Sequence, residues 1–117
     1  MLFRSLVIAF NYGSRQEMAH AMKAVAEQVA SGALDPASIN AKSIERFLMT
    51  DGIPEPDLLI RTSGEQRLSN FLLWQLAYAE FVFLPVLWPD FDKVHLAEAI
   101  NLFHARNRRF GGIGSVP

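Results

Sequence analysis

The 117-residue sequence has no cysteine, which excludes disulfide bonds and metal sites built from thiolates. Its formal net charge is only −1, so no overall positive field attracts nucleic acid. Its three histidines are scattered along the chain and show none of the spacings of a metal site. No apolar run reaches the roughly 18 residues that span a membrane, and the amino-terminal segment lacks a signal-peptide cleavage region. These absences predict a cytoplasmic protein with no nucleic-acid partner and no integral membrane segment.

The composition is that of an ordinary globular domain, with 50% hydrophobic and 20% charged residues. Apolar runs predict buried strands at residues 6–10, 58–60 and 81–83, with 86–88 continuing the sheet. Helical spacing predicts helices at residues 18–29, 41–49, 69–79 and 96–103, the first ended by Ser31 and Gly32. Because strands alternate with helices, we expect an α/β fold with a parallel sheet and helices on its faces. A compact small domain and half of a larger domain both fit this pattern.

The most informative segment is a polar loop that follows the apolar strand at residues 58–60. It contains Arg61 and Arg67, and Ser69 is placed to cap the next predicted helix. In open α/β sheets ligands bind at the carboxyl ends of strands, and helix amino termini favour anions. Arginine forks suit phosphate oxygens, so the loop is predicted to hold a phosphate or diphosphate. Pairing of the arginines with acidic neighbours in a purely structural network stays open as the alternative.

Five motifs, read together, resemble the undecaprenyl diphosphate synthases, which are bacterial cis-prenyltransferases. The motifs are Asn11-Tyr-Gly-Ser-Arg15, Arg61-Thr-Ser-Gly-Glu-Gln-Arg67-Leu-Ser-Asn-Phe-Leu-Leu-Trp-Gln75, Ala77-Tyr-Ala-Glu80, Leu87-Trp-Pro-Asp-Phe91 and Arg108-Arg-Phe-Gly-Gly112. The resemblance covers nearly the whole chain but begins in the middle of the family's sequence. The family's amino-terminal Asp-Gly-Asn and Ser-x-Glu-Asn motifs do not occur here. The resemblance therefore implies that residues 1–117 are the carboxyl-terminal part of a single cis-prenyltransferase domain, about half of it, with a partial parallel sheet and helices on its faces.

The family's activity is the cis-condensation of isopentenyl diphosphate onto an allylic, farnesyl-type diphosphate, assisted by Mg²⁺. The product is a polyprenyl diphosphate that carries cell-wall precursors. The resemblance thus implies a transferase that works as a cytoplasmic homodimer. It also implies that this chain is inactive alone, because half of the site and the product tunnel lie in the missing part.

The resemblance assigns roles to ten residues. It implies that Arg61, Arg67 and Ser69 hold isopentenyl diphosphate and that Glu80 is linked to Mg²⁺. Residues expected to support the site or to contact the partner subunit are Asn11, Tyr12, Glu65, Asn70, Arg109 and Gly111. The structural alternatives to these roles are a solvated or capping carboxylate at Glu80, an ordinary turn at Asn11 and a basic helix end at Arg109. Ser63 stands where many family members have glycine.

A second hypothesis is a non-catalytic partner, or dimerisation module, of a longer cis-prenyltransferase. Degenerate partners are expected to lose the arginine loop. Here Arg61, Arg67, Ser69 and Glu80 are all present, which argues against that hypothesis. A generic anion- or nucleic-acid-binding domain that uses Arg106, Arg108 and Arg109 is disfavoured by the near-neutral charge.

Overall fold

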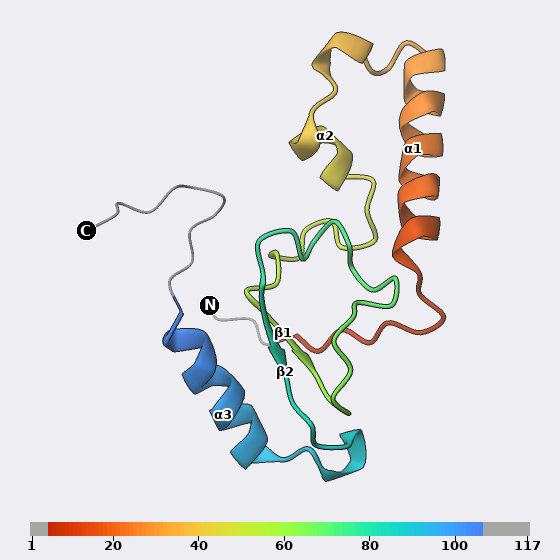
Figure 1. Ribbon diagram of the computed structural model, residues 1–117. Helices are drawn as coiled ribbons and strands as arrows, with labels where there is room; N and C mark the ends of the chain where they lie inside the picture. The colour runs from red at the N-terminus through yellow and green to blue at the C-terminus, as the bar shows by residue number, and fades with distance from the viewer. Residues whose placement is uncertain (1–4, 107–117) are drawn as a thin grey trace, which may run out of the picture. The chain divides into compact units, whose positions relative to one another are not determined.

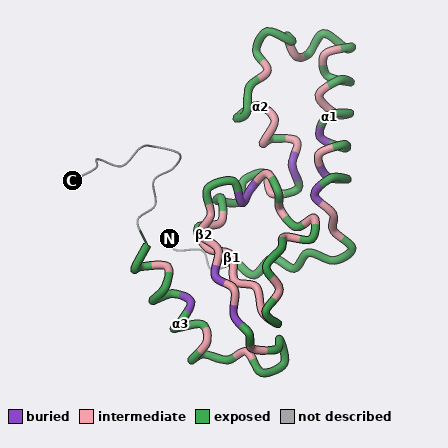
Figure 2. Tube along the Cα trace, viewed as in Figure 1, coloured by how far each residue is buried: buried purple, intermediate pink, exposed green. Residues whose placement is uncertain are grey.

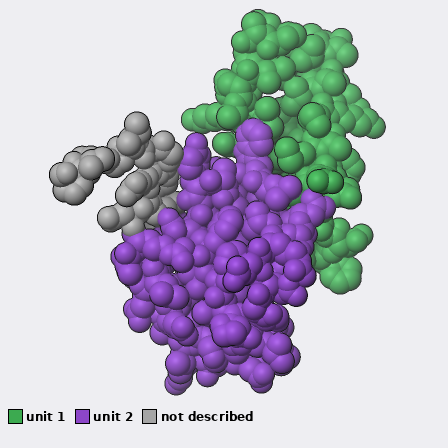
Figure 3. Space-filling model, in the orientation of Figure 1, with its two compact units in different colours: residues 1–53 green, residues 54–117 purple. Residues whose placement is uncertain are grey.

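The computed structural model describes residues 5–106. The chain forms two compact units, residues 1–53 and residues 54–117, which are coloured separately in Figure 3. Unit 1 is helical, and unit 2 contains the sheet (Figure 1).

Unit 1 contains the helix α1 (Ser14–Ala30), the 3₁₀ turn η1 (Pro36–Ser38) and the short helix α2 (Ala41–Glu45). The predicted end of α1 is confirmed, because Ser31 is its C-cap and Gly32 follows with φ of 76°. The helix predicted at 41–49 is shorter than expected. Asn40 and Ser43 form its capping box, but α2 ends at Glu45 and turns follow.

The apolar side of α1 lines a cavity of about 500 Å³ within unit 1. The opposite wall comes from η1, the residues after it and α2. The lining residues are Met22, Val25, Ala26, Val29, Ala30, Pro36, Ile39 and Ile44. The spacing that predicted the helix therefore marks the side of α1 that faces the rest of unit 1.

The strand predicted at residues 6–10 does not form. The segment is irregular and exposed in Figure 2, with Leu6 88% and Phe10 93% exposed. A buried parallel strand requires a hydrogen-bonded neighbour and cover on both faces. Within the described residues the sheet has only two strands, and neither pairs with this segment. Apolar composition alone therefore does not make a strand here.

Unit 2 is built around the parallel pair β1 (Leu58–Arg61) and β2 (Glu80–Phe83). The register places Leu58 beside Glu80 and Arg61 beside Phe83. Both strands occur where apolar runs predict them, but β1 is only half-buried along its length. The predicted continuation at 86–88 is wrong, since the 3₁₀ turn η2 (Trp88–Asp90) forms there with Pro89 in its first turn.

The last helix, α3 (Lys93–His104), confirms the helix predicted around residues 96–103. Its N-cap is Asp92, whose side chain accepts hydrogen bonds from the N–H groups of Val94 and His95. The buried core of unit 2 joins Ala99 of α3 to β2 and the residue after it. The core residues are Val82, Leu84 and Ala99, with Leu58, Ile60, Val86 and Phe91 packed around them.

Within residues 5–106 no helix combines the length and the hydropathy that crossing a bilayer requires. The α/β class predicted from the sequence is confirmed as a parallel two-stranded sheet with helices. The described part of the chain has two strands rather than the three or four that apolar runs suggested.

Candidate diphosphate site

Arg61 is the last residue of β1, and its guanidinium closes the loop that follows. Its Nη1 donates to the carbonyl oxygen of Arg67 and, at 3.1 Å, to the hydroxyl Oγ of Ser69. Strand pairing fixes the backbone of Arg61, whose carbonyl accepts a 2.9 Å hydrogen bond from the N–H of Leu84. The structure thus brings Arg61, Arg67 and Ser69 together at the carboxyl end of β1.

A tight turn over residues 62–65 starts this loop. Ser63 and Gly64 have φ of 65° and 66°, and the N–H of Glu65 points back to the carbonyl of Thr62 at 3.5 Å. Two consecutive left-handed residues are the pattern of a type I′ turn, which favours glycine or asparagine. The turn is tied to the segment after β2, because Ser63 N–H donates to Val86 at 2.7 Å and Gly64 N–H to Leu84 at 3.0 Å.

Arg67 forms an ion pair with Glu65 across the same loop. The side chains are 65% and 38% exposed, so water screens the pair and it contributes little to stability. The alternative to a phosphate site was that the arginines pair with acidic neighbours, and Arg67 does have such a partner in Glu65. A doubly charged diphosphate would compete with Glu65 for a guanidinium that already faces solvent.

The helix predicted at residues 69–79 is absent, and this expectation is wrong. Ser69, Asn70 and Leu72 all have positive φ, at 49°, 64° and 45°, which a right-handed helix does not allow. A series of turns forms instead, held by bonds such as Leu76 N–H to the Leu72 carbonyl at 3.0 Å. Gln75 and Leu76 are buried, so tertiary packing overrides the local helix propensity.

The loss of this helix changes the physical account of the site. Ser69 caps no helix, so the helix dipole drops out of the argument for an anion. What remains is the fork of Arg61, the exposed guanidinium of Arg67 and the hydroxyl of Ser69. These are charge-assisted and hydroxyl donors, which suit phosphate oxygens without a helix.

Glu80 lies at the opposite end of the sheet from this loop. It begins β2, pairs in register with Leu58, and is three positions away from the register of Arg61. Three residues along a strand cover about 10 Å. Its carboxylate Oε2 accepts a 3.1 Å hydrogen bond from Nη1 of Arg106, with which it forms an ion pair.

The described residues do not fit a Mg²⁺ site around Glu80. Among residues 5–106 no three histidine or carboxylate side chains gather to hold a metal ion. Glu80 is a single carboxylate, and it is already neutralised by a guanidinium. Mg²⁺ prefers several oxygen ligands in octahedral geometry, which one paired carboxylate does not supply.

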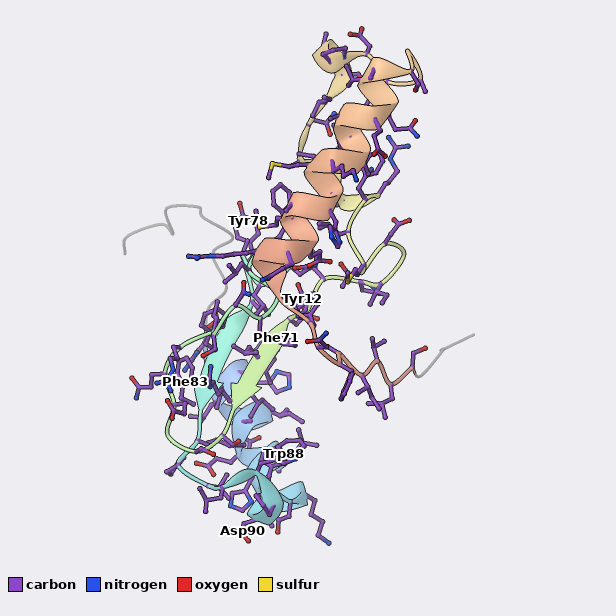
Figure 4. The ribbon with its side chains drawn as sticks, turned by 90° about the vertical axis from the view of Figure 1, so that its right-hand side faces the viewer. Tyr12, Phe71, Tyr78, Phe83, Trp88 and Asp90 are labelled. Carbon is purple, nitrogen blue, oxygen red and sulfur yellow. The ribbon has the colours of Figure 1, made fainter. Side chains whose placement is uncertain are left out.

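Asn11 and Tyr12 belong to unit 1, whereas the arginine loop belongs to unit 2. Asn11 has φ of 51° and lies at a bend shortly before α1. Tyr12 lies just before α1 (Figure 4), and its hydroxyl donates to Oε2 of Glu17. Oε1 of Glu17 accepts the backbone N–H of Met49 at 2.7 Å.

Glu17 and Arg106 are described contact residues that the sequence analysis does not select. Glu17 is only 1% exposed, and a buried glutamate is uncommon unless it has partners. Its signal is its place on the helical face shared with Ser14 and Ala21, both buried. In the sequence, Arg106 stands out only as part of a basic cluster.

Three further residues were predicted to support the site or to contact a partner subunit. Arg109 and Gly111 lie outside the described residues, and Asn70 lies within the loop with φ of 64°.

Comparison with known proteins identifies the family. A family model described as "Putative undecaprenyl diphosphate synthase" matches residues 3–111. The chain therefore belongs to the undecaprenyl diphosphate synthase family of prenyltransferases, which confirms the resemblance seen in its motifs.

Curated relatives agree with this assignment. The chain is 60% identical over 109 residues to isoprenyl transferase 2 of Bradyrhizobium diazoefficiens and to the isoprenyl transferase of Brucella abortus. Each match covers 93% of this chain and 43% of the relative. The chain thus spans less than half the length of the curated relatives that it matches.

Solved structures support the fold. The crystal structure of lavandulyl diphosphate synthase from Lavandula x intermedia, in complex with dimethylallyl diphosphate, matches with a TM-score of 0.82 at 46% identity. That match covers 86% of this chain and 43% of that structure. A structure described as "a probable undecaprenyl diphosphate synthase" from Campylobacter jejuni matches with a TM-score of 0.68 at 37% identity. It covers 86% of this chain and 44% of that one.

Proposed function

We propose that this chain supplies the isopentenyl diphosphate site of a cis-prenyltransferase, with Arg61, Arg67 and Ser69 as the diphosphate ligands. The observation that carries the proposal is the closed loop in which Arg61 bonds both the Arg67 carbonyl and the Ser69 hydroxyl. A guanidinium has five N–H donors, and both bonds start from Nη1. Nε and Nη2 of Arg61 can therefore bind an anion, while the two hydrogen bonds from Nη1 hold the guanidinium in the loop.

The reaction proposed for the whole protein is the cis-condensation of isopentenyl diphosphate onto an allylic diphosphate, making a polyprenyl diphosphate lipid carrier. The allylic carbon–oxygen bond breaks and diphosphate leaves. The isopentenyl double bond forms the new carbon–carbon bond, and loss of a proton restores the alkene. The part proposed for this chain is orientation, because fixing one anion places its double bond against the allylic carbon. Membership in the prenyltransferase family supports this reaction.

A second line of support comes from the lavandulyl diphosphate synthase structure, which was solved with dimethylallyl diphosphate. An allylic diphosphate is thus a ligand of a protein with this fold. Mg²⁺, when bound, supplies charge neutralisation at the leaving diphosphate. We assign no step to it in this chain, because the carboxylate of Glu80 is paired with Arg106.

The proposal extends to a cytoplasmic homodimer and to inactivity of the 117-residue chain alone. Inactivity is supported by the 43% coverage of the relatives and by the absence of a metal-ligand cluster among residues 5–106. A chain that orients one diphosphate without the second substrate's site binds but does not condense. Incubation with farnesyl diphosphate, isopentenyl diphosphate and Mg²⁺ should therefore yield no longer diphosphate.

Isothermal titration of isopentenyl diphosphate into the chain tests the site. Each charge-assisted contact contributes about 1.5–3 kcal/mol, so the double variant Arg61→Ala, Arg67→Ala should bind at least about a hundredfold more weakly. Inorganic diphosphate should compete, since the proposed contacts are to the anion. Arg46→Ala, an exposed arginine in unit 1, is the matched control and should bind normally. Equal binding by the double variant, or no binding by a folded chain, would overturn the assignment.

A further inference from the structure

Arg106 joins two parts of unit 2 that are far apart in sequence. It follows the end of α3, where Ala105 is the C-cap. Its Nη1 donates at 3.1 Å to Oε2 of Glu80 and at 2.6 Å to the backbone carbonyl of Phe81. One guanidinium therefore contacts the first two residues of β2, 25 and 26 positions earlier in the chain.

The Phe81 carbonyl faces away from β1. The N–H groups of Glu80 and Leu84 donate to the carbonyls of Asp57 and Arg61, each at 2.9 Å. In a parallel pair, alternate residues of a strand direct their backbone groups to the same neighbour. Glu80 and Leu84 thus face β1, and Phe81 between them faces the outer edge of β2.

An open strand edge exposes backbone groups that can pair with other chains, and proteins cover such edges. Arg106 satisfies one edge carbonyl and neutralises the carboxylate beside it. The same helix is held at its middle by Ala99, which packs with Val82 and Leu84 in the core. Contacts with β2 therefore hold α3 both at its middle and just beyond its end.

We infer that the ion pair between Glu80 and Arg106 is an anchor, that is, a contact that fixes the end of α3 to the start of β2. In this chain Glu80 therefore positions α3 and does not serve as a metal ligand. The contacts that carry this inference are separate from those of the arginine loop, so it does not depend on diphosphate binding. The anchor fixes Arg106, the last residue that the structure describes, against the start of β2. Family resemblance gave Glu80 a metal role, and the geometry gives it a different one.

Hydrogen exchange of the backbone amides of residues 102–105, measured by NMR, tests the anchor. A partly exposed ion pair is worth about 0.2–1 kcal/mol, which is a factor of about 1.4 to 5 in a local opening equilibrium. Glu80→Gln keeps the shape of the side chain and removes its charge, so these amides should exchange faster by a factor of about 1.4 to 5. Glu98→Gln, the same change at an exposed position of α3, is the matched control and should leave them within error.

A double-variant cycle and a metal titration decide between the two roles of Glu80. If Glu80 and Arg106 act on each other, Glu80→Gln should accelerate exchange less in an Arg106→Gln background than in the unsubstituted chain, because Arg106→Gln already removes the pair. Millimolar Mg²⁺ added to the unsubstituted chain should leave the exchange unchanged. Unchanged exchange in Glu80→Gln would overturn the anchor. Faster exchange on adding Mg²⁺, absent in Glu80→Gln, would show that the metal takes the carboxylate from Arg106 and would equally overturn it.

Discussion

The two units place their charged clusters in opposite environments. In unit 1 the carboxylate of Glu17 is 1% exposed and accepts hydrogen bonds from Tyr12 and Met49. In unit 2 the ion pair of Arg67 and Glu65 has side chains 65% and 38% exposed. A buried charge must be satisfied by fixed partners, whereas an exposed one can exchange its partner for a ligand. Burial therefore separates the cluster that stabilises its unit from the cluster for which we propose diphosphate binding.

The largest expected effect concerns Glu17. Glu17→Ala removes the carboxylate that the Tyr12 hydroxyl and the Met49 N–H donate to, which should cost about 2–4 kcal/mol of unfolding free energy. Glu65→Ala, the matched removal of an exposed carboxylate, should cost less than about 1 kcal/mol. Urea unfolding followed by circular dichroism measures both. Similar costs for the two variants would remove burial as the distinction between the clusters.

A smaller effect is expected at Ser63, within the arginine loop. Ser63 has φ of 65°, which glycine adopts without the steric cost borne by residues with a Cβ. Ser63→Gly should therefore raise the unfolding free energy by about 0.5–1 kcal/mol, measured by the same urea titration.

Ser31→Gly is the matched control, because Ser31 has φ of −79° and gains nothing from glycine. A gain of the same size at Ser31 would show that the effect at Ser63 does not come from its left-handed backbone. A loss at Ser63 would mean that its side chain contributes more to the loop than its backbone strain costs.

Local signals predicted those elements whose packing partners lie in the same unit. The apolar run at β1 forms a strand because β2 pairs with it, whereas the equally apolar Leu6–Phe10 has no strand partner among the described residues. Helical spacing located α1 and α3, and Ser31 and Gly32 marked the end of α1. At residues 69–79 the same signals failed, because three residues with positive φ and the burial of Gln75 and Leu76 decide the backbone.

The candidate site was predictable in part for the same reason. Arg61, Arg67 and Ser69 lie within nine residues of chain, so a short loop can bring them together, and it does. The contacts that were missed join distant positions: Glu17 with Met49, and Glu80 with Arg106. Sequence spacing carries no information about such pairs, which depend on how the elements pack.

The smallest expected effect, and the sharpest test of the comparison, concerns Asp92. Like Glu17 it accepts backbone N–H groups, at 2.9 Å from Val94 and 3.2 Å from His95, but its side chain is 58% exposed. The backbone N–H of His95 is the main cause that lowers the pKa of Asp92 below 3.8; slight burial opposes it, and Val94 and the His95 side chain add to it. A lowered pKa means that the folded state favours the ionised form. Its stabilisation is therefore complete above pH 3.8 and is lost as pH falls through the lower, folded-state value.

Asp92→Asn keeps a capping oxygen but cannot ionise, so it isolates that contribution. The variant should unfold at slightly lower urea concentration than the unsubstituted chain at pH 6, and the difference should shrink below pH 4 and vanish in stronger acid. Asp90→Asn, the same change in η2, should show no such convergence. Because water competes for an exposed cap, the difference at pH 6 should stay well below that of Glu17→Ala. If the two effects were equal, the hydrogen bonds that a carboxylate accepts, rather than its burial, would govern its contribution to stability in both units.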